Sequence, residues 1–337
     1  MQGNTLTSKS LMVASKDVKI QITSGLLTLA RRPHFTGVLL IDGIKFTSQK
    51  SGMDRLLTSI DGAAPVEMIN LDLYGIPVDS LRAYAELKEG TLDLSGMYIE
   101  GASGNAHGST SINTTGNSTF DLFISLDNAN IRQSLNAVTQ EEPWIRGTMD
   151  LEGHLWGNTD SINGSLVLTA RDGKIQKYAL FSRIFALLNV YKIIQSRDIE
   201  LTSKNFPYNL ISSTFSLDDN TISFDDFYFD SNSLQISAVG TYSLKAREID
   251  SIFGVQPFES FDRAIGMIPL LGWILTGDDK KLIVVSMKVQ GDIDDPSVQI
   301  APLATLSEPV KNSLLRALEL SSDVIKKSQE LLPGGKD

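Results

Sequence analysis

Apolar and polar residues alternate one by one in many short segments of this chain, and this pattern constrains the fold more than any other feature. Successive side chains of a β-strand point to opposite faces, so each apolar row marks one face of a sheet. The alternation is weaker over 18–22, 38–46, 91–99, 149–155, 165–169, 211–217 and 221–229. The clearest rows are Phe120, Leu122, Ile124 and Leu126; Leu234, Ile236, Ala238 and Tyr242; and Ile283, Val285, Met287 and Val289.

Single-faced alternation is typical of antiparallel sheets, because buried parallel strands contain continuous apolar runs. We therefore predict a mostly β chain with an antiparallel sheet. Residues that tolerate positive φ or bond their own backbone favour tight turns. This predicts hairpin turns at Asp42-Gly43, Asp61-Gly62, Asp172-Gly173 and Asp219-Asn220. The glycine-rich run 101–108 lacks the spacing of a phosphate-binding loop and is expected to form a hairpin.

Three segments depart from the alternation. Apolar residues at helical spacing over 178–194 predict a short amphipathic helix. The apolar run 264–275 is interrupted by Gly266, Pro269 and Gly272 and is too short to cross a bilayer. A further amphipathic helix is expected to start at Ser307, and we expect it to bind a membrane surface or a partner, with packing on the sheet as the alternative.

The few short helices leave much of the apolar sheet surface uncovered. Such a sheet has to close into a β-sandwich or barrel, or bind an apolar ligand on an open, curved face. Both alternatives remain open at this point. We predict three regions: β repeats over 1–74 that continue from an upstream part, a β region over 75–302 with the inserted segments 178–194 and 264–275, and a C-terminal helix and tail over 303–337.

Composition excludes several classes of function. The chain has 42 % hydrophobic and 21 % charged residues, which is typical of folded proteins. Its net charge of -10, without a basic stripe, argues against a nucleic-acid partner. It has no cysteine, its three histidines lack metal-ligand spacing, and its adjacent carboxylates lie at expected turns. We therefore expect no catalytic residue, metal or cofactor, and no enzymatic activity.

The order of several motifs resembles a known family. They are the residues from Gly147 to Gly157, from Ile162 to Leu166 and from Arg171 to Ile175, followed by the leucine-rich segment 180–188 and by Ile268 to Gly272, Val289 to Gly291 and Pro296. This order resembles the C-terminal region of the AsmA-like family of Gram-negative envelopes, which includes the larger relatives TamB and YhdP. The resemblance covers about residues 75 to 302, and the inner-membrane helix usual at the N-terminus of the family is absent from this sequence.

The resemblance implies an elongated, curved antiparallel sheet that forms an open trough with apolar side chains inside. It also implies non-enzymatic phospholipid transport between the inner and outer membranes, in a periplasmic monomer tethered to the inner membrane through a segment absent from this chain. The implied partners are phospholipid, a membrane surface and an envelope assembly protein. The alternative is a structural or interaction module in outer-membrane biogenesis.

On this interpretation the apolar strand rows contact acyl chains, and the broken apolar segment contacts a membrane. The expected lipid contacts are Phe120, Leu122, Ile124, Leu126, Leu234, Ile236, Tyr242, Ile283, Val285, Met287 and Val289. The expected membrane contacts are Ile268, Leu270, Leu271, Trp273 and Ile274.

Overall fold

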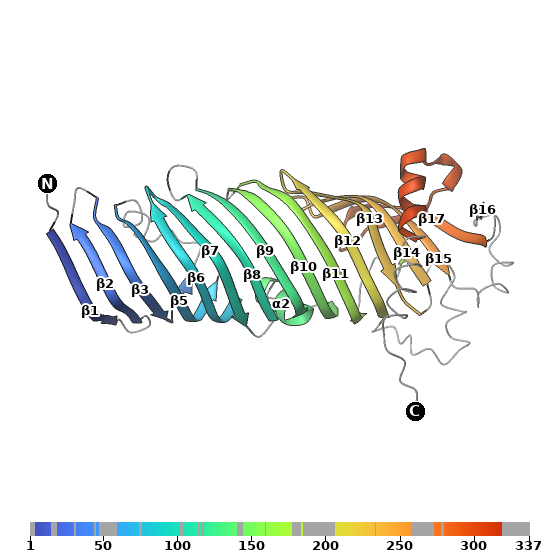
Figure 1. Cartoon of the computed structure of the whole chain (residues 1–337). Coiled ribbons are helices and arrows are strands. Elements are labelled where there is room, and N and C mark those ends of the chain that lie inside the picture. Colours follow the sequence, from blue (N-terminus) through green and yellow to red (C-terminus); the bar gives the residue numbers. More distant parts are fainter. Residues whose placement is uncertain are drawn as a thin grey trace, which may run out of the picture. The chain divides into compact units, whose positions relative to one another are not determined.

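The computed structural model shows a mostly β chain, as predicted (Figure 1). It describes residues 4–14, 19–29, 32–43, 45–46, 59–73, 76–101, 104–113, 115, 118–139, 144–158, 160–176, 183–184, 206–232, 234–257, 273–277 and 280–318. The chain divides into two compact units. The N-terminal unit comprises Met1–Pro143 and Thr148–Leu166, and the C-terminal unit comprises Trp144–Gly147 and Val167–Asp337. The three regions predicted from the sequence stay a prediction.

The N-terminal unit is an open sheet whose strands follow one another in chain order. Most neighbours pair antiparallel, each strand with the next. The elements are β1 (Asn4–Ala14), β2 (Lys19–Leu29), β3 (His34–Asp42), β4 (Lys45–Phe46), β5 (Asp61–Leu73), β6 (Ile76–Lys88), β7 (Thr91–Gly101), β8 (Gly104–Asn113), β9 (Thr119–Asn130), helix α2 (Ile131–Thr139), and the parts of β10 (Ile145–Asn158) and β11 (Ile162–Ile175) that belong to this unit.

One pairing departs from the predicted antiparallel pattern. Strand β5 runs parallel to β3 and to the short β4, with Leu39 opposite Val66 and Ile41 opposite Met68. A parallel pair requires a connection that returns the chain to the same end of the sheet. Alternation indicates that only one side of a sheet is buried, and it favours antiparallel pairing only indirectly. A parallel pair with one uncovered side alternates too, so the sequence pattern did not reveal this exception.

The C-terminal unit contains the remaining strands, and they also pair antiparallel. They are β12 (Phe206–Asp218), β13 (Thr221–Asp230), β14 (Leu234–Ser243), β15 (Glu248–Pro257), β16 (Trp273–Gly277), β17 (Lys280–Asp292) and β18 (Ser297–Ile300), followed by the 3-10 helix η2 (Leu303–Thr305). Residues 308–318 are helical. The core of this unit includes Phe229, Ile236, Val255 and Met287, each almost completely buried.

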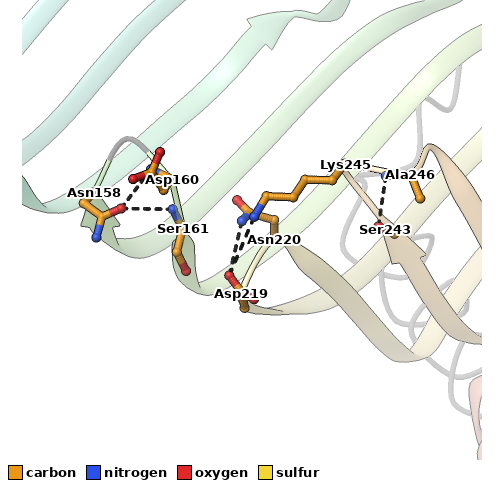
Figure 2. A network of polar contacts seen from close by, with 8 residues as sticks. All are labelled: Asn158, Asp160, Ser161, Asp219, Asn220, Ser243, Lys245 and Ala246. Carbon is orange, nitrogen blue, oxygen red and sulfur yellow. Dashed lines mark hydrogen bonds and ion pairs between the residues drawn. The ribbon is translucent and has the colours of Figure 1, made fainter.

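The predicted turns had mixed outcomes. Asp219 and Asn220 have φ angles of 41° and 63° and form the hairpin between β12 and β13, where Lys245 Nζ lies 4.0 Å from Asp219 Oδ1 (Figure 2). Gly101 pairs with Gly104, so the expected glycine-rich hairpin joins β7 and β8. The hairpin predicted at Asp42-Gly43 is not formed. Gly43, with φ of 82°, directly follows β3, but β3 and β4 both run parallel to β5, so the chain keeps its direction across this turn.

Two further turn predictions were wrong. Asp61 and Gly62 begin β5, and Gly62 faces Phe35 of β3. Asp172 lies inside β11 with φ of 51°, so its positive φ makes an irregularity within the strand and not a hairpin. The β10–β11 turn lies earlier, where the side chain of Asn158 accepts hydrogen bonds from the backbone N–H groups of Asp160 and Ser161 (Figure 2).

The predicted non-β segments are described only in part. Of 178–194 the structure describes two helical residues, Arg183 and Ile184, and the rest lies outside the described residues. Residues 264–272 also lie outside them, whereas Trp273 begins β16, which pairs with β17. Within the described part of the chain, no helix has the length and apolar character needed to span a membrane.

The expectation that the C-terminal helix would not pack on the sheet was wrong for residues 308–318. Leu314 and Leu318 are buried, and Leu318 packs in a cluster with Tyr228 of β13 and Val284 of β17. An amphipathic helix can cover either a membrane surface or a sheet, and its sequence alone does not distinguish the two. Here the sheet supplies the apolar partner.

Candidate functional site

A continuous apolar surface covers one side of the N-terminal sheet, and we call it the apolar face. Strand β9 shows how it is assembled. Its row of four apolar residues faces Ile112, Thr110, Gly108 and Ala106 on β8 and Gly157, Leu155, Gly153 and Leu151 on β10. Directly opposite residues of paired strands lie on the same side of a sheet. The register therefore joins the separate apolar rows into one surface.

The same register carries the apolar face across the other strands of the unit. Each strand contributes a row of apolar residues, with glycine, serine or threonine at a few positions. At the paired positions of the described strands β1–β3 and β5–β10, no charged side chain lies on this side. The rows include Leu6 and Leu11; Ile20, Ile22 and Leu27; Phe35, Leu39 and Ile41; Ala64, Val66 and Met68; Leu81, Ala83, Ala85 and Leu87; and Leu92, Leu94, Met97 and Ile99.

Small residues on alternate strands shape the apolar face. Strand β6 carries Ala83 and Ala85, and β8 carries Ala106 and Gly108, so larger side chains on neighbouring strands meet above them. Leu122 of β9 accordingly packs against a buried cluster formed by β5, β6 and β7. Helix α2 contacts both β9 and β6, although β7 and β8 separate these strands. Both contacts show that this part of the sheet is curved.

The apolar face is most open near the first strands. Leu6 is 58 % exposed and Leu11 is 49 % exposed, whereas Leu81 and Met97 in the middle strands are 6 % exposed. Side chains of β5 to β7 converge in the buried cluster, against which Leu122 of β9 also packs. The apolar side chains of β1 and β2 are thus exposed to water. Such a surface can bind another apolar molecule.

An aromatic ring packs on glycines within this face. A Cβ atom on Gly37 would lie 2.8 Å from Cζ of Phe35, and one on Gly25 would lie 3.4 Å from the same ring. Both positions therefore need glycine, because a methyl group would collide with the ring or crowd it. The ring of Phe35 takes the space that the two missing side chains leave.

The expected lipid contacts fall into two groups. Phe120, Leu122, Ile124 and Leu126 lie together on the apolar face and are partly buried. Leu234, Ile236, Val285, Met287 and Val289 lie in the C-terminal unit and are at most 4 % exposed, while Tyr242 of the same unit is partly buried. The first group belongs to the N-terminal unit and the second to the C-terminal unit.

The other expected contacts lie beyond what the structure describes. The backbone of Ile283 belongs to β17, but its side chain is outside the described set. Trp273 and Ile274 belong to β16, again without a described side chain, and Ile268, Leu270 and Leu271 lie outside the described residues. Their roles stay predictions.

The opposite side of the N-terminal sheet is mostly polar and charged over β5 to β10. Arg82 lies 3.2 Å from Glu67 and 3.7 Å from Glu100 on neighbouring strands, and both pairs are exposed to solvent. His154 also lies on this side, and its Nε2 atom lies 3.0 Å from Oδ1 of Asp121. One side of the sheet thus meets water while the other carries the apolar face.

Among the described residues, no group of three histidine, aspartate or glutamate residues is arranged to hold a metal ion. A buried carboxylate does occur in the C-terminal unit, where Asp230 accepts hydrogen bonds from Asn209, Tyr228 and Gln235. These bonds tie together β12, β13 and β14 and satisfy the carboxylate, which fits a structural role.

One side chain has a strongly shifted pKa. Burial, with a smaller contribution from the charge of Asp172, raises the pKa of Tyr208 to about 12. Its hydroxyl donates a hydrogen bond of 2.8 Å to the carbonyl oxygen of Arg146. Its ring lies against Gly147 and Gly173, repeating the packing of Phe35 on glycines. Tyr208 therefore acts as a neutral packing residue at ordinary pH.

Comparisons with known proteins add no further information about the site. No protein-family model, no curated protein and no solved structure matches this chain.

Proposed function

We propose that this chain binds phospholipid along the apolar face of its N-terminal unit, with acyl chains against the strand rows and head groups in water. The observation that carries the proposal is the continuity of the apolar face across successive paired strands, without a charged side chain at a paired position. Burial of each methylene group contributes about 0.8 kcal/mol, so two acyl chains would be held firmly.

The biological setting is part of the same proposal. The resemblance to the AsmA-like family supports non-enzymatic phospholipid movement between the two membranes of a Gram-negative envelope, by a periplasmic monomer tethered to the inner membrane. A membrane surface and an envelope assembly protein would be its partners. A lipid carrier needs no reacting groups, which agrees with the structural roles found above for the polar clusters.

The test uses adjacent residues on opposite sides of β3. Leu39 lies on the apolar face, and Val38 lies on the other side and is 45 % exposed. The unmodified chain and the variants Leu39→Gln and Val38→Gln are purified without detergent, and their organic extracts are analysed by mass spectrometry. We expect phospholipid on the parent and on Val38→Gln, and several-fold less on Leu39→Gln, because an amide on the apolar face must be desolvated.

Unfolding midpoints of both variants show whether each remains folded. An extract of the parent chain no richer in phospholipid than that of an unrelated soluble protein would rule out the proposed function. If both folded variants lost the same amount of lipid, the binding site would not lie on the apolar face. A stable protein complex without lipid would favour the interaction module.

A further inference from the structure

A group of aromatic side chains lies on the polar side of the N-terminal sheet, opposite the apolar face. The rings of Phe123 on β9 and His154 on β10 are stacked, with centroids 3.8 Å apart and planes 8° apart. The ring of Trp156 lies 4.7 Å from that of His154. Asp121 holds the imidazole, with Oδ1 3.0 Å from Nε2. We call these four residues the aromatic patch.

The aromatic patch is open to solvent. Phe123 is 51 % exposed and Trp156 is 43 % exposed, and both lie in rows that are otherwise polar. A cross-strand aromatic pair stabilises a sheet, and the stack of Phe123 on His154 accounts for that effect. It does not account for Trp156, which adds a large exposed indole to the same surface.

Small polar side chains surround the aromatic patch. Ser109 is opposite Phe123 on β8, Ser111 is opposite Asp121, and Ser125 is opposite Glu152 on β10. Asp93 of β7 is opposite Ser111, which extends the polar surface by one strand. Strands in a sheet are about 4.8 Å apart, so the four strands β7 to β10 span about 14 Å. The surface is wide enough for more than a single small ring.

We propose that the aromatic patch binds a glycan. A sugar ring has an apolar face of C–H groups, which can stack on an exposed aromatic ring, and an edge of hydroxyl groups that donate and accept hydrogen bonds. Trp156 and Phe123 offer the aromatic surfaces. The serine hydroxyls donate and accept, and the carboxylates of Asp121 and Glu152 accept.

The charges around the aromatic patch argue against other ligands. On this side of the described strands β7–β10, the paired positions carry no lysine or arginine, so a phosphate or another anion would find no counter-charge. A cation would be attracted by the carboxylates, but it binds best against open ring faces, and here two of the rings are stacked on each other.

The test measures oligosaccharide binding to the full chain by isothermal titration calorimetry, with cellohexaose, chitohexaose and mannohexaose as probes. We expect at least one probe to bind, and its affinity to fall at least tenfold in Trp156→Ala and in Phe123→Ala. The matched control is Trp144→Ala, because Trp144 has the same 43 % exposure but lies in the C-terminal unit. This control should bind like the parent.

The outcomes separate the possibilities. Unfolding midpoints close to that of the parent show that the variants are folded. The milder variant Trp156→Phe should retain part of the affinity for the oligosaccharide. Absence of binding for all three probes at millimolar concentration would overturn the proposal, as would equal binding by parent and folded Trp156→Ala. Tight binding of choline in place of the sugars would identify a cation site instead. Leu39→Gln, on the opposite side of the sheet, should bind the glycan normally, so failure of lipid binding and failure of glycan binding are distinguishable.

Discussion

At the scale of single residues, Tyr208 links packing to pH. Its pKa is raised to about 12 because burial disfavours the charged phenolate. Because the pKa of Tyr208 is higher in the folded protein than in the unfolded chain, its neutral hydroxyl stabilises the fold fully below the ordinary tyrosine pKa of about 10. This stabilisation is lost as the pH rises through 12. We expect Tyr208→Phe to lower the free energy of unfolding by about 1 kcal/mol at pH 8, since one buried hydrogen bond is lost. The same variant should lose less stability than the parent between pH 10 and 12.

Denaturant unfolding of both proteins at pH 8 and pH 11 measures these differences. Tyr84→Phe is the control. Tyr84 is 49 % exposed, so this change removes one tyrosine hydroxyl without disturbing a buried group. If Tyr208→Phe and the parent lost stability in parallel above pH 10, the buried hydroxyl would not be the cause.

At the scale of elements, the helix over 308–318 is part of the C-terminal core. Leu314 is 1 % exposed and Leu318 is 3 % exposed. We expect Leu314→Ala to destabilise the chain by about 2 to 5 kcal/mol, because it leaves a cavity between helix and sheet.

Truncation after Ala304 should also lower the unfolding midpoint, since it uncovers Tyr228 and Val284. The exposed Arg316→Ala in the same helix is the control, and thermal unfolding is the measurement. A midpoint unchanged by the truncation would show that the helix is only loosely attached.

At the scale of the whole molecule, the two units differ in what their apolar rows can contact. Ile124 lies on the partly buried apolar face, whereas Ile236 is 0 % exposed in the C-terminal unit. If the chain carries lipid as proposed, a spin-labelled phospholipid should broaden the NMR methyl signal of Ile124 more strongly than that of Ile236. A diamagnetic phospholipid is the control. Equal broadening of both methyl groups would mean that the C-terminal core opens to admit lipid.

Much of the candidate site could be predicted from local sequence. The row from Phe120 to Leu126 was recognised as an apolar strand face. The aromatic patch was missed, although Phe123 interrupts a polar row and Trp156 follows His154 at strand spacing. Only the register between β9 and β10 shows that these rings meet, and register is a property of two strands together.

The sequence by itself determined that the chain is mostly β and, for rows such as Phe120 to Leu126, which side of the strand is apolar, because side-chain direction alternates along an extended backbone. It also located the Asp219-Asn220 hairpin, whose residues adopt positive φ readily. Tertiary structure decided the parallel pairing of β3 with β5, since alternation shows only that one side of the sheet is uncovered and does not fix the direction of each strand. It also decided which apolar rows stay accessible. The rows of β9 and β14 look alike in sequence, yet the first remains partly exposed and Ile236 in the second is buried, because burial depends on what distant segments place above each sheet face.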